Sequence, residues 1–347
     1  MKPVPSKKGT TKQPNSFQAE LEKGDEALRT SDLRKAQGHY TKVAQQANAA
    51  DSVKELAAAL QGSARVLDLM GHYGQAIMTY HEALKCFLQI GEKPGIARAK
   101  GFLGISSWAT GDYSEAGRLF AEALFLYEEA RDLRGQAWVH DQIGNLKLAM
   151  RDDLEAEKSY YKSHELMEGI GADEEVKAWE FYHRATVELF REHFLQAKAY
   201  FEEALKSFQK RPDLLGKVAV RIHLGEIACA RKDLVAAQDH LQKAVVEVLP
   251  TGCKPLLMDA LVGVSQLLKA QGLERKAIGI LMVALSHPTC RQQTKDRMVS
   301  LVIHLESRFT SQEVQGGFQW AKEVSIEQMA KAWVDSLAPA PKDKKRK

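Results

Sequence analysis

Apolar and small residues recur along this chain with a period of about forty residues. Alanine stands at seven positions that are 40 or 41 residues apart. A large apolar residue follows four positions after each alanine, and a smaller one three positions after that. The seven alanines are Ala36, Ala76, Ala116, Ala156, Ala197, Ala237 and Ala277. A fixed period of this length indicates a solenoid, in which each unit buries its apolar face only against its neighbours.

Each unit predicts two helices joined by a short turn. In the third unit, the apolar and small residues of 114–129 fall three and four positions apart, which is one face of a helix. The preceding break at 110–113 reads Thr-Gly-Asp-Tyr, where glycine suits a helix C-terminus and aspartate the next N-cap. Twelve residues before each alanine comes a small residue, Gly104 in this unit, and Phe120 would fill the space that it leaves.

This pattern resembles the tetratricopeptide repeat (TPR). The residues that carry the match are Leu-Gly at 103–104 and 224–225 with Ile-Gly at 143–144, Gly-Asp-Tyr-x-x-Ala at 111–116, Phe120 and Ala123-Leu124. The forty-residue period and the joint at 91–97 are most similar to the C-terminal TPR sensor regions of bacterial ATPase and transcriptional regulators. The resemblance implies an all-α, right-handed superhelical solenoid of about seven TPR-like hairpins with C-terminal capping helices.

Four segments follow from this pattern. Residues 1–15 and 338–347 are rich in Lys and Pro and predict disordered basic tails. Residues 16–290 hold the seven repeats, and 291–337 predict the capping helices. A capping-box pattern, Ser-Ile-Glu-Gln at 325–328, opens the last of these helices. The sequence leaves open whether the helix at 325–337 folds back into the groove of the superhelix.

Charge and composition narrow the partners. The net charge is +4, but each basic tail carries about +4, which leaves about −4 for the repeats. A nucleic-acid-binding solenoid would hold its basic excess on the folded surface, so the distribution argues against nucleic acid as a partner. The chain shows no secretory signal and no apolar stretch long enough for a membrane span. Its four cysteines form no CxxC pair, which favours reduced thiols in the cytoplasm.

Catalytic and metal-binding patterns do not emerge. The sequence has no GxSxG, P-loop, HExxH, EF-hand or GxGxxG motif, and its eleven histidines are scattered without metal-ligand spacing. We therefore expect no enzyme activity, no metal and no cofactor.

The candidate binding residues come from the resemblance. In a TPR superhelix, the first helix of each unit lines the concave groove at its second, fifth, ninth and twelfth positions. Carried onto this chain, these positions give Arg65, Asp68, Arg98, Trp108, Trp138, Asp141, Asn145, Trp179 and Tyr182. Aromatic anchors among a few polar groups suit a peptide-binding surface. The alternative for Trp138 and Trp179 is that they pack between repeats as core.

The expected function is a non-catalytic scaffold that holds another protein or a peptide in the concave groove. One alternative is a peptide-sensing receptor whose superhelix changes conformation on binding and so regulates an effector protein. A second alternative, an RNA-binding helical-repeat protein, is disfavoured by the charge of the repeats.

Overall fold

The computed structural model describes residues 14–171, 174–210, 213–306, 309 and 323–337. The predicted basic tail at 338–347 and residues 1–13 of the one predicted at 1–15 lie outside these residues. The described chain consists of α-helices, short turns and one 3₁₀ turn at Leu249–Thr251, without a strand. No helix in this part of the protein is long and apolar enough to cross a membrane.

Fourteen helices pair in sequence order into seven hairpins. They are α1 (Pro14–Arg29) with α2 (Leu33–Ala49), α3 (Val53–Leu69) with α4 (Tyr73–Ile90), α5 (Lys93–Thr110) with α6 (Tyr113–Glu129), α7 (Leu133–Ala149) with α8 (Asp153–Glu168), α9 (Glu174–Phe190) with α10 (Phe194–Gln209), α11 (Leu214–Ala230) with α12 (Leu234–Val248), and α13 (Lys254–Ala270) with α14 (Glu274–Ser286). Among the described residues after these hairpins, two further helices follow, α15 (Gln292–Glu306) and α17 (Ile326–Ser336). The predicted solenoid of seven helical hairpins is confirmed.

The turn inside each hairpin repeats one backbone conformation. One residue per turn takes a left-handed φ between 60° and 94°, and these residues recur with the period of the alanines: Ser31, Gly71, Gly111, Arg151, Glu192, Lys232 and Gly272. An aspartate then caps several of the following helices. The side chain of Asp112, for example, accepts a hydrogen bond from the Glu115 backbone N–H at 3.0 Å. The turn therefore ends one helix and starts the next within three residues.

Close packing of a small residue against a large apolar side chain, an aromatic ring in the first five hairpins, holds each hairpin together. All seven repeat alanines are fully buried, and so are the large side chains four positions later. At Gly104, an added Cβ would lie only 2.6 Å from Cε1 of Phe120, and at Gly144 it would lie 2.4 Å from Cε1 of Tyr160. The first helix thus approaches the ring of the second more closely than any side chain would allow, as the sequence predicts.

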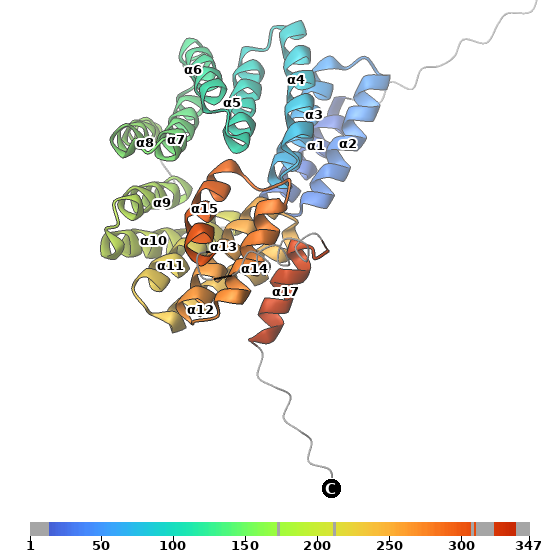
Figure 1. Cartoon of the computed structure of the whole chain (residues 1–347). Coiled ribbons are helices and arrows are strands. Elements are labelled where there is room, and N and C mark those ends of the chain that lie inside the picture. The colour runs from blue at the N-terminus through green and yellow to red at the C-terminus, as the bar shows by residue number, and fades with distance from the viewer. Residues whose placement is uncertain (1–13, 172–173, 211–212, 307–308, 310–322, 338–347) are drawn as a thin grey trace, which may run out of the picture.

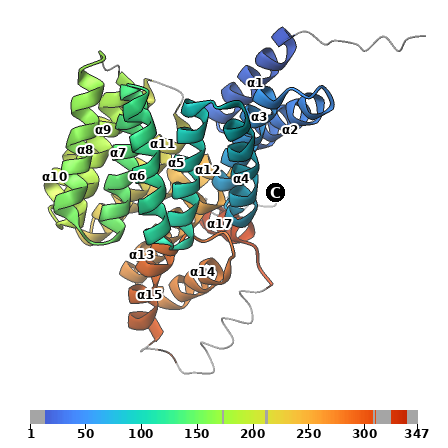
Figure 2. The same ribbon diagram turned by 90° about the horizontal axis from the view of Figure 1, so that it is seen from above.

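The hairpins stack side by side into a curved row (Figure 1). From α5 to α12, the odd-numbered helices lie on the inner side and the even-numbered helices on the outer side. The row curves so far that its C-terminal part returns to the first half of the chain, where α15 contacts α5 (Figures 1 and 2). One continuous buried apolar cluster includes Tyr40 and Val66 of the first two hairpins and Met258 and Leu281 of the last. The superhelix is therefore closed on itself.

The two C-terminal helices lie on different sides of this end. Helix α17 begins with the predicted capping box, in which Ser325 and Gln328 bond each other's backbone, and it packs against α12, α13 and α14 through Met329 and Trp333. Helix α15 instead turns to the inner side and contacts α13, α14 and α5. The connection before α15 passes the α3–α4 turn so closely that a Cβ on Gly71 would lie 2.4 Å from Cβ of Thr289. The helix on the inner side is thus α15.

Candidate functional site

The inner side carries two groups of aromatic and polar side chains. The first, which we call the α5–α7 group, consists of Arg65, Phe102 and Trp138. The Arg65 guanidinium carbon lies 5.0 Å from the centre of the Phe102 ring, and that ring lies 4.9 Å from the Trp138 ring. All three side chains are half-buried. A guanidinium over an aromatic face is a favourable arrangement, and the group leaves part of each side chain accessible.

Trp138 also packs between repeats, as the alternative interpretation of the sequence held. An added Cβ on Gly101 of α5 would lie 2.4 Å from the Trp138 ring. The indole therefore rests on the backbone of the preceding unit and shows only part of its surface to solvent. This packing fixes the ring in place, and a preorganised ring loses little conformational entropy when a partner binds.

The second group, which we call the α7–α9 group, consists of Asp141, Trp179, Tyr182 and His183. The Trp179 ring meets the Tyr182 ring edge-on at 5.3 Å, and it also contacts Phe208 at 5.1 Å. Trp179 and Tyr182 are half-buried, whereas His183 is only 3% exposed.

Asp141 and His183 are adjacent in this group. Nδ1 of His183 lies 3.4 Å from Oδ1 of Asp141, without hydrogen-bond geometry. Burial raises the pKa of Asp141 to about 7 and lowers the pKa of His183 to about 3, since both neutral forms are favoured away from water. The His183 ring stacks on the Tyr160 ring at 4.3 Å. The pair is therefore a packed polar contact between repeats.

The other candidate residues differ in what they can offer a partner. Asp68 accepts a hydrogen bond from Oγ of Ser106 at 2.8 Å, and burial raises its pKa to about 7. Oδ1 of Asn145 accepts a hydrogen bond from the Tyr160 hydroxyl at 2.8 Å. These two side chains are engaged in contacts within the fold.

Arg98 and Trp108 belong to neither of these two groups. Arg98 is exposed. Trp108 is half-buried, and its ring N–H finds no hydrogen-bond partner among the described residues. Its backbone carbonyl accepts a hydrogen bond from Nε2 of Gln293 in α15 at 2.6 Å. Helix α15 thus covers the C-terminal end of α5.

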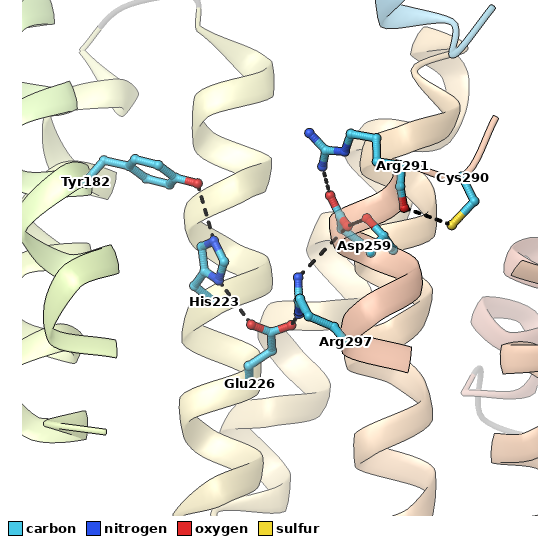
Figure 3. Close-up of polar contacts among 8 residues, drawn as sticks. Tyr182, His223, Glu226, Asp259, Cys290, Arg291 and Arg297 are labelled. Atoms are coloured by element: carbon cyan, nitrogen blue, oxygen red, sulfur yellow. Dashed lines mark hydrogen bonds and ion pairs between the residues drawn. The ribbon is translucent and has the colours of Figure 1, made fainter. Parts of the chain in front are cut away.

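A third set of polar residues connects the inner side to α15 (Figure 3). We call it the arginine network, and it contains Tyr182, His223, Glu226, Asp259, Arg291, Thr294 and Arg297. The Tyr182 hydroxyl lies 3.3 Å from Nε2 of His223, whose Nδ1 lies 3.0 Å from Oε2 of Glu226. Arg297 then pairs with Glu226, and Arg291 pairs with Asp259.

Residues of this network were not among the sequence candidates, except Tyr182. The repeat period contains a signal for two of them. In the first helix of the sixth unit, Glu226 stands at the ninth position, which Asn145 holds in the fourth unit. In the first helix of the seventh unit, Asp259 stands at the second position, which Trp179 holds in the fifth unit. In each of these two helices, the acidic residue stands among largely apolar residues of the sequence. Extending the same positions through the last two units would have found both.

A metal site does not emerge from this geometry. Among the described residues, no three His, Cys, Asp or Glu side chains come together in a group that could hold a metal ion.

Comparison with known proteins identifies the fold. No family model matches the sequence, and no curated protein does so either. Among solved structures, NprR in complex with its cognate peptide NprX has a TM-score of 0.68 and 12% identity, over 91% of this chain and 89% of that chain. The fold is a TPR-like helical-repeat solenoid.

Two further structures of this TPR-like fold are informative. The Rap conjugation gene regulator of the plasmid pLS20, in complex with the Phr* peptide, has a TM-score of 0.58 and 12% identity, over 97% of this chain and 82% of that chain. Aspartyl phosphate phosphatase F from Bacillus subtilis has a TM-score of 0.52 and 11% identity, over 94% of this chain and 96% of that chain. At these identities the similarity shows the shared TPR-like solenoid.

Proposed function

We propose that this protein is a non-catalytic binding protein that holds a peptide, or an extended segment of a partner protein, on the inner side of its superhelix. The observation that carries the proposal is the pair of half-buried aromatic groups on α5, α7 and α9. Trp138, Trp179 and Tyr182 each expose part of a ring that packing holds in place. Rigid, partly accessible aromatic rings are the usual anchors of a binding surface.

The peptide complexes of NprR and of the pLS20 Rap regulator support this proposal, because both peptides are bound by proteins with the same TPR-like fold. The polar candidates divide into two roles. Arg65 and Arg98 are the accessible ones, and we assign them to contact a partner's carboxylates or carbonyls. Asp68, Asp141 and Asn145 are assigned to orient the inner helices, since their polar atoms already contact neighbours within the fold.

We infer that the chain is not an enzyme, although one structural neighbour is a phosphatase. The side chains most suited to acid–base chemistry are Asp141 and His183, and His183 is 3% exposed beneath Tyr160 and Trp179. A buried imidazole with a pKa of about 3 is a poor proton acceptor near neutral pH.

We also propose a role beside a regulatory effector protein in the cytoplasm, as in the bacterial regulators that the repeats resemble. The four cysteines are free, which supports a reducing compartment.

Selection of peptides from a random library against the full chain tests the binding proposal. Affinities of the selected peptides would be measured by fluorescence anisotropy for the wild type and for Trp138→Leu and Trp179→Leu. We expect at least a tenfold loss in each variant, about 1.4 kcal/mol. Tyr161→Ala is the matched control, because Tyr161 is an aromatic residue on the outer helix α8 and is 70% exposed. Equal affinity for all four proteins would place binding outside the inner side and refute the proposal.

A further inference from the structure

Helix α15 occupies the inner side of the superhelix in the way that a bound segment would. It packs against α13 and α14, pairs with Glu226 of α11 through Arg297 (Figure 3), and contacts α5 on its other side. Nε2 of Gln293 donates to the Trp108 carbonyl at 2.6 Å, and the Tyr113 hydroxyl donates to Asp296 at 3.4 Å. Helix α15 thus contacts the end of α5 and the start of α6, which lie far from it in the sequence.

The contacts on the other side are charged and deeply placed. Arg291 pairs with Asp259, and Arg297 pairs with Glu226. Thr294 donates from its hydroxyl to Asp259 at 2.6 Å. The side chains of Asp259 and Glu226 are only 9% and 11% exposed, so each carboxylate depends on its arginine for compensation. Although burial opposes it, Arg297 and His223 hold the pKa of Glu226 below its usual range.

Apolar contacts hold α15 less firmly than they hold the repeats. Among the side chains of α15 that the structure describes, Met298 and Val302 are buried and Leu301 packs partly buried against the core cluster, whereas Val299 is 47% and Ile303 is 63% exposed. By contrast, α13 buries side chains along its whole length. The contacts of 291–297 with Glu226 and Asp259 are ion pairs and hydrogen bonds, and another chain that makes the same polar contacts can replace them.

We propose that α15 is an internal occupant of the binding face, and that Glu226 and Asp259 are a guanidinium-binding site which an arginine-bearing partner peptide takes over when it displaces α15. This inference rests on the proposed function and names the partner chemistry. A peptide without arginine would leave two buried carboxylates unpaired, so it would be rejected. The spacing of Arg291, just before α15, and Arg297 within it indicates two arginines about six residues apart.

Tethering explains why the internal segment occupies the face in the free protein. A segment attached to the chain has an effective concentration in the millimolar range, which an external peptide of equal contacts cannot match. The external partner must therefore bind more tightly than α15 does, for example by adding contacts to Tyr182, which belongs to the arginine network, and to Trp179, whose ring meets that of Tyr182. The site then responds to a specific partner and remains closed to weak competitors.

The test uses the full chain and a fluorescein-labelled peptide that copies residues 288–303 with serine in place of Cys290. The chain variants are R291A/R297A, which frees the acidic pair, and K295A, which removes one positive charge from the same helix as a control. We expect R291A/R297A to bind the peptide at least tenfold more tightly than the wild type and K295A to bind as the wild type does. A peptide with alanine in place of both arginines should bind the double variant at least tenfold more weakly.

Hydrogen exchange of the same proteins separates release of α15 from loss of folding. In R291A/R297A, the amides of 292–303 should exchange faster while those of α13 keep their protection. Simultaneous loss of protection in both helices would show that α15 is an integral part of the last repeat, and it would overturn the inference. So would equal peptide affinity in all three chains.

The two proposals can fail separately. Library peptides that depend on Trp138 and Trp179, together with no binding of the 288–303 peptide to R291A/R297A, would leave the proposed function standing and refute the inference. Binding of the 288–303 peptide to R291A/R297A, together with library peptides that bind Trp138→Leu and Trp179→Leu as tightly as the wild type, would locate the arginine site and refute the aromatic one.

Discussion

Replacing Gly104 with leucine should destabilise the protein through one contact that the structure defines. An added Cβ at this position would lie 2.6 Å from Cε1 of Phe120, and Phe120 is 1% exposed, so the ring has no open space into which to move. Overpacking of this kind costs about 1 to 3 kcal/mol. Leucine also favours helix over glycine by about 0.8 kcal/mol, which partly offsets the loss.

A second glycine separates these two effects. Gly38 lies in the interior of α2, is exposed, and has no atom within 4 Å of an added Cβ. Gly38→Leu therefore carries the same gain in helix propensity without the clash. The difference between the free energies of unfolding of the two variants is then the packing cost alone, about 1 to 3 kcal/mol in favour of Gly38→Leu.

Urea unfolding followed by circular dichroism measures this difference. We expect the midpoint to fall for Gly104→Leu and to stay constant or rise for Gly38→Leu. Shortening the opposing ring side chain, Phe120→Leu, should cost less in the Gly104→Leu background than in the wild type, because it relieves the clash. Equal shifts for both glycine variants, or strictly additive costs in the double variant, would refute the close approach of the two helices as the reason for glycine at 104.

Three further predictions concern a helix cap, a buried histidine and the thiols. Asp132→Ala should lower the free energy of unfolding by about 1 kcal/mol, measured by urea titration, because its carboxylate accepts the Gly135 backbone N–H at 2.9 Å; an unchanged midpoint would contradict this. His183 has a pKa of about 3 when folded against 6.5 as its ordinary value, so the unfolded chain binds the extra proton and the wild type loses stability as pH falls below 6.5. His183→Phe should therefore gain on the wild type by about 1.4 kcal/mol per pH unit between pH 6.5 and 4.5, and a constant difference between the two urea curves would exclude the buried neutral form. Burial raises the pKa of the Cys253 thiol to about 11 and that of the Cys290 thiol to about 12, so Ellman's reagent at pH 8 should modify the half-buried Cys86 before these two, and the reverse order would show that the seventh repeat opens readily.

Much of the fold could be predicted from the sequence because the repeat is written in local terms. A buried alanine, a large apolar residue four residues later and a small residue twelve residues earlier define one hairpin, and the contacts between them lie within a single unit. The left-handed residue in each turn is less visible, since Arg151 and Lys232 adopt it as well as glycine. The register of the repeat nevertheless locates it.

The placement of α15 could not be predicted because its partners are remote. Arg297 pairs with a glutamate 71 residues earlier, and Gln293 bonds a carbonyl 185 residues earlier. In the sequence, both arginines are typical of a solvated helix face. The register of the repeat indicates Asp68 and Asn145 as candidates, but it does not reveal that the hydroxyls of Ser106 and Tyr160 donate hydrogen bonds to them. Whether the candidates contact a partner stays a prediction.

The apolar cluster shared by the first and last hairpins changes how this protein should come apart. An open row of repeats frays from its two free ends, and removing a terminal unit costs one interface. Tyr40 of the first hairpin and Leu281 of the seventh belong to the same buried cluster, and the second hairpin meets the connection before α15 where Gly71 faces Thr289. Unfolding of the first two hairpins therefore disturbs contacts of the last one as well as those of their neighbours in sequence. Deleting the first hairpin would remove part of this shared cluster, and its cost would be felt more than two hundred residues along the chain.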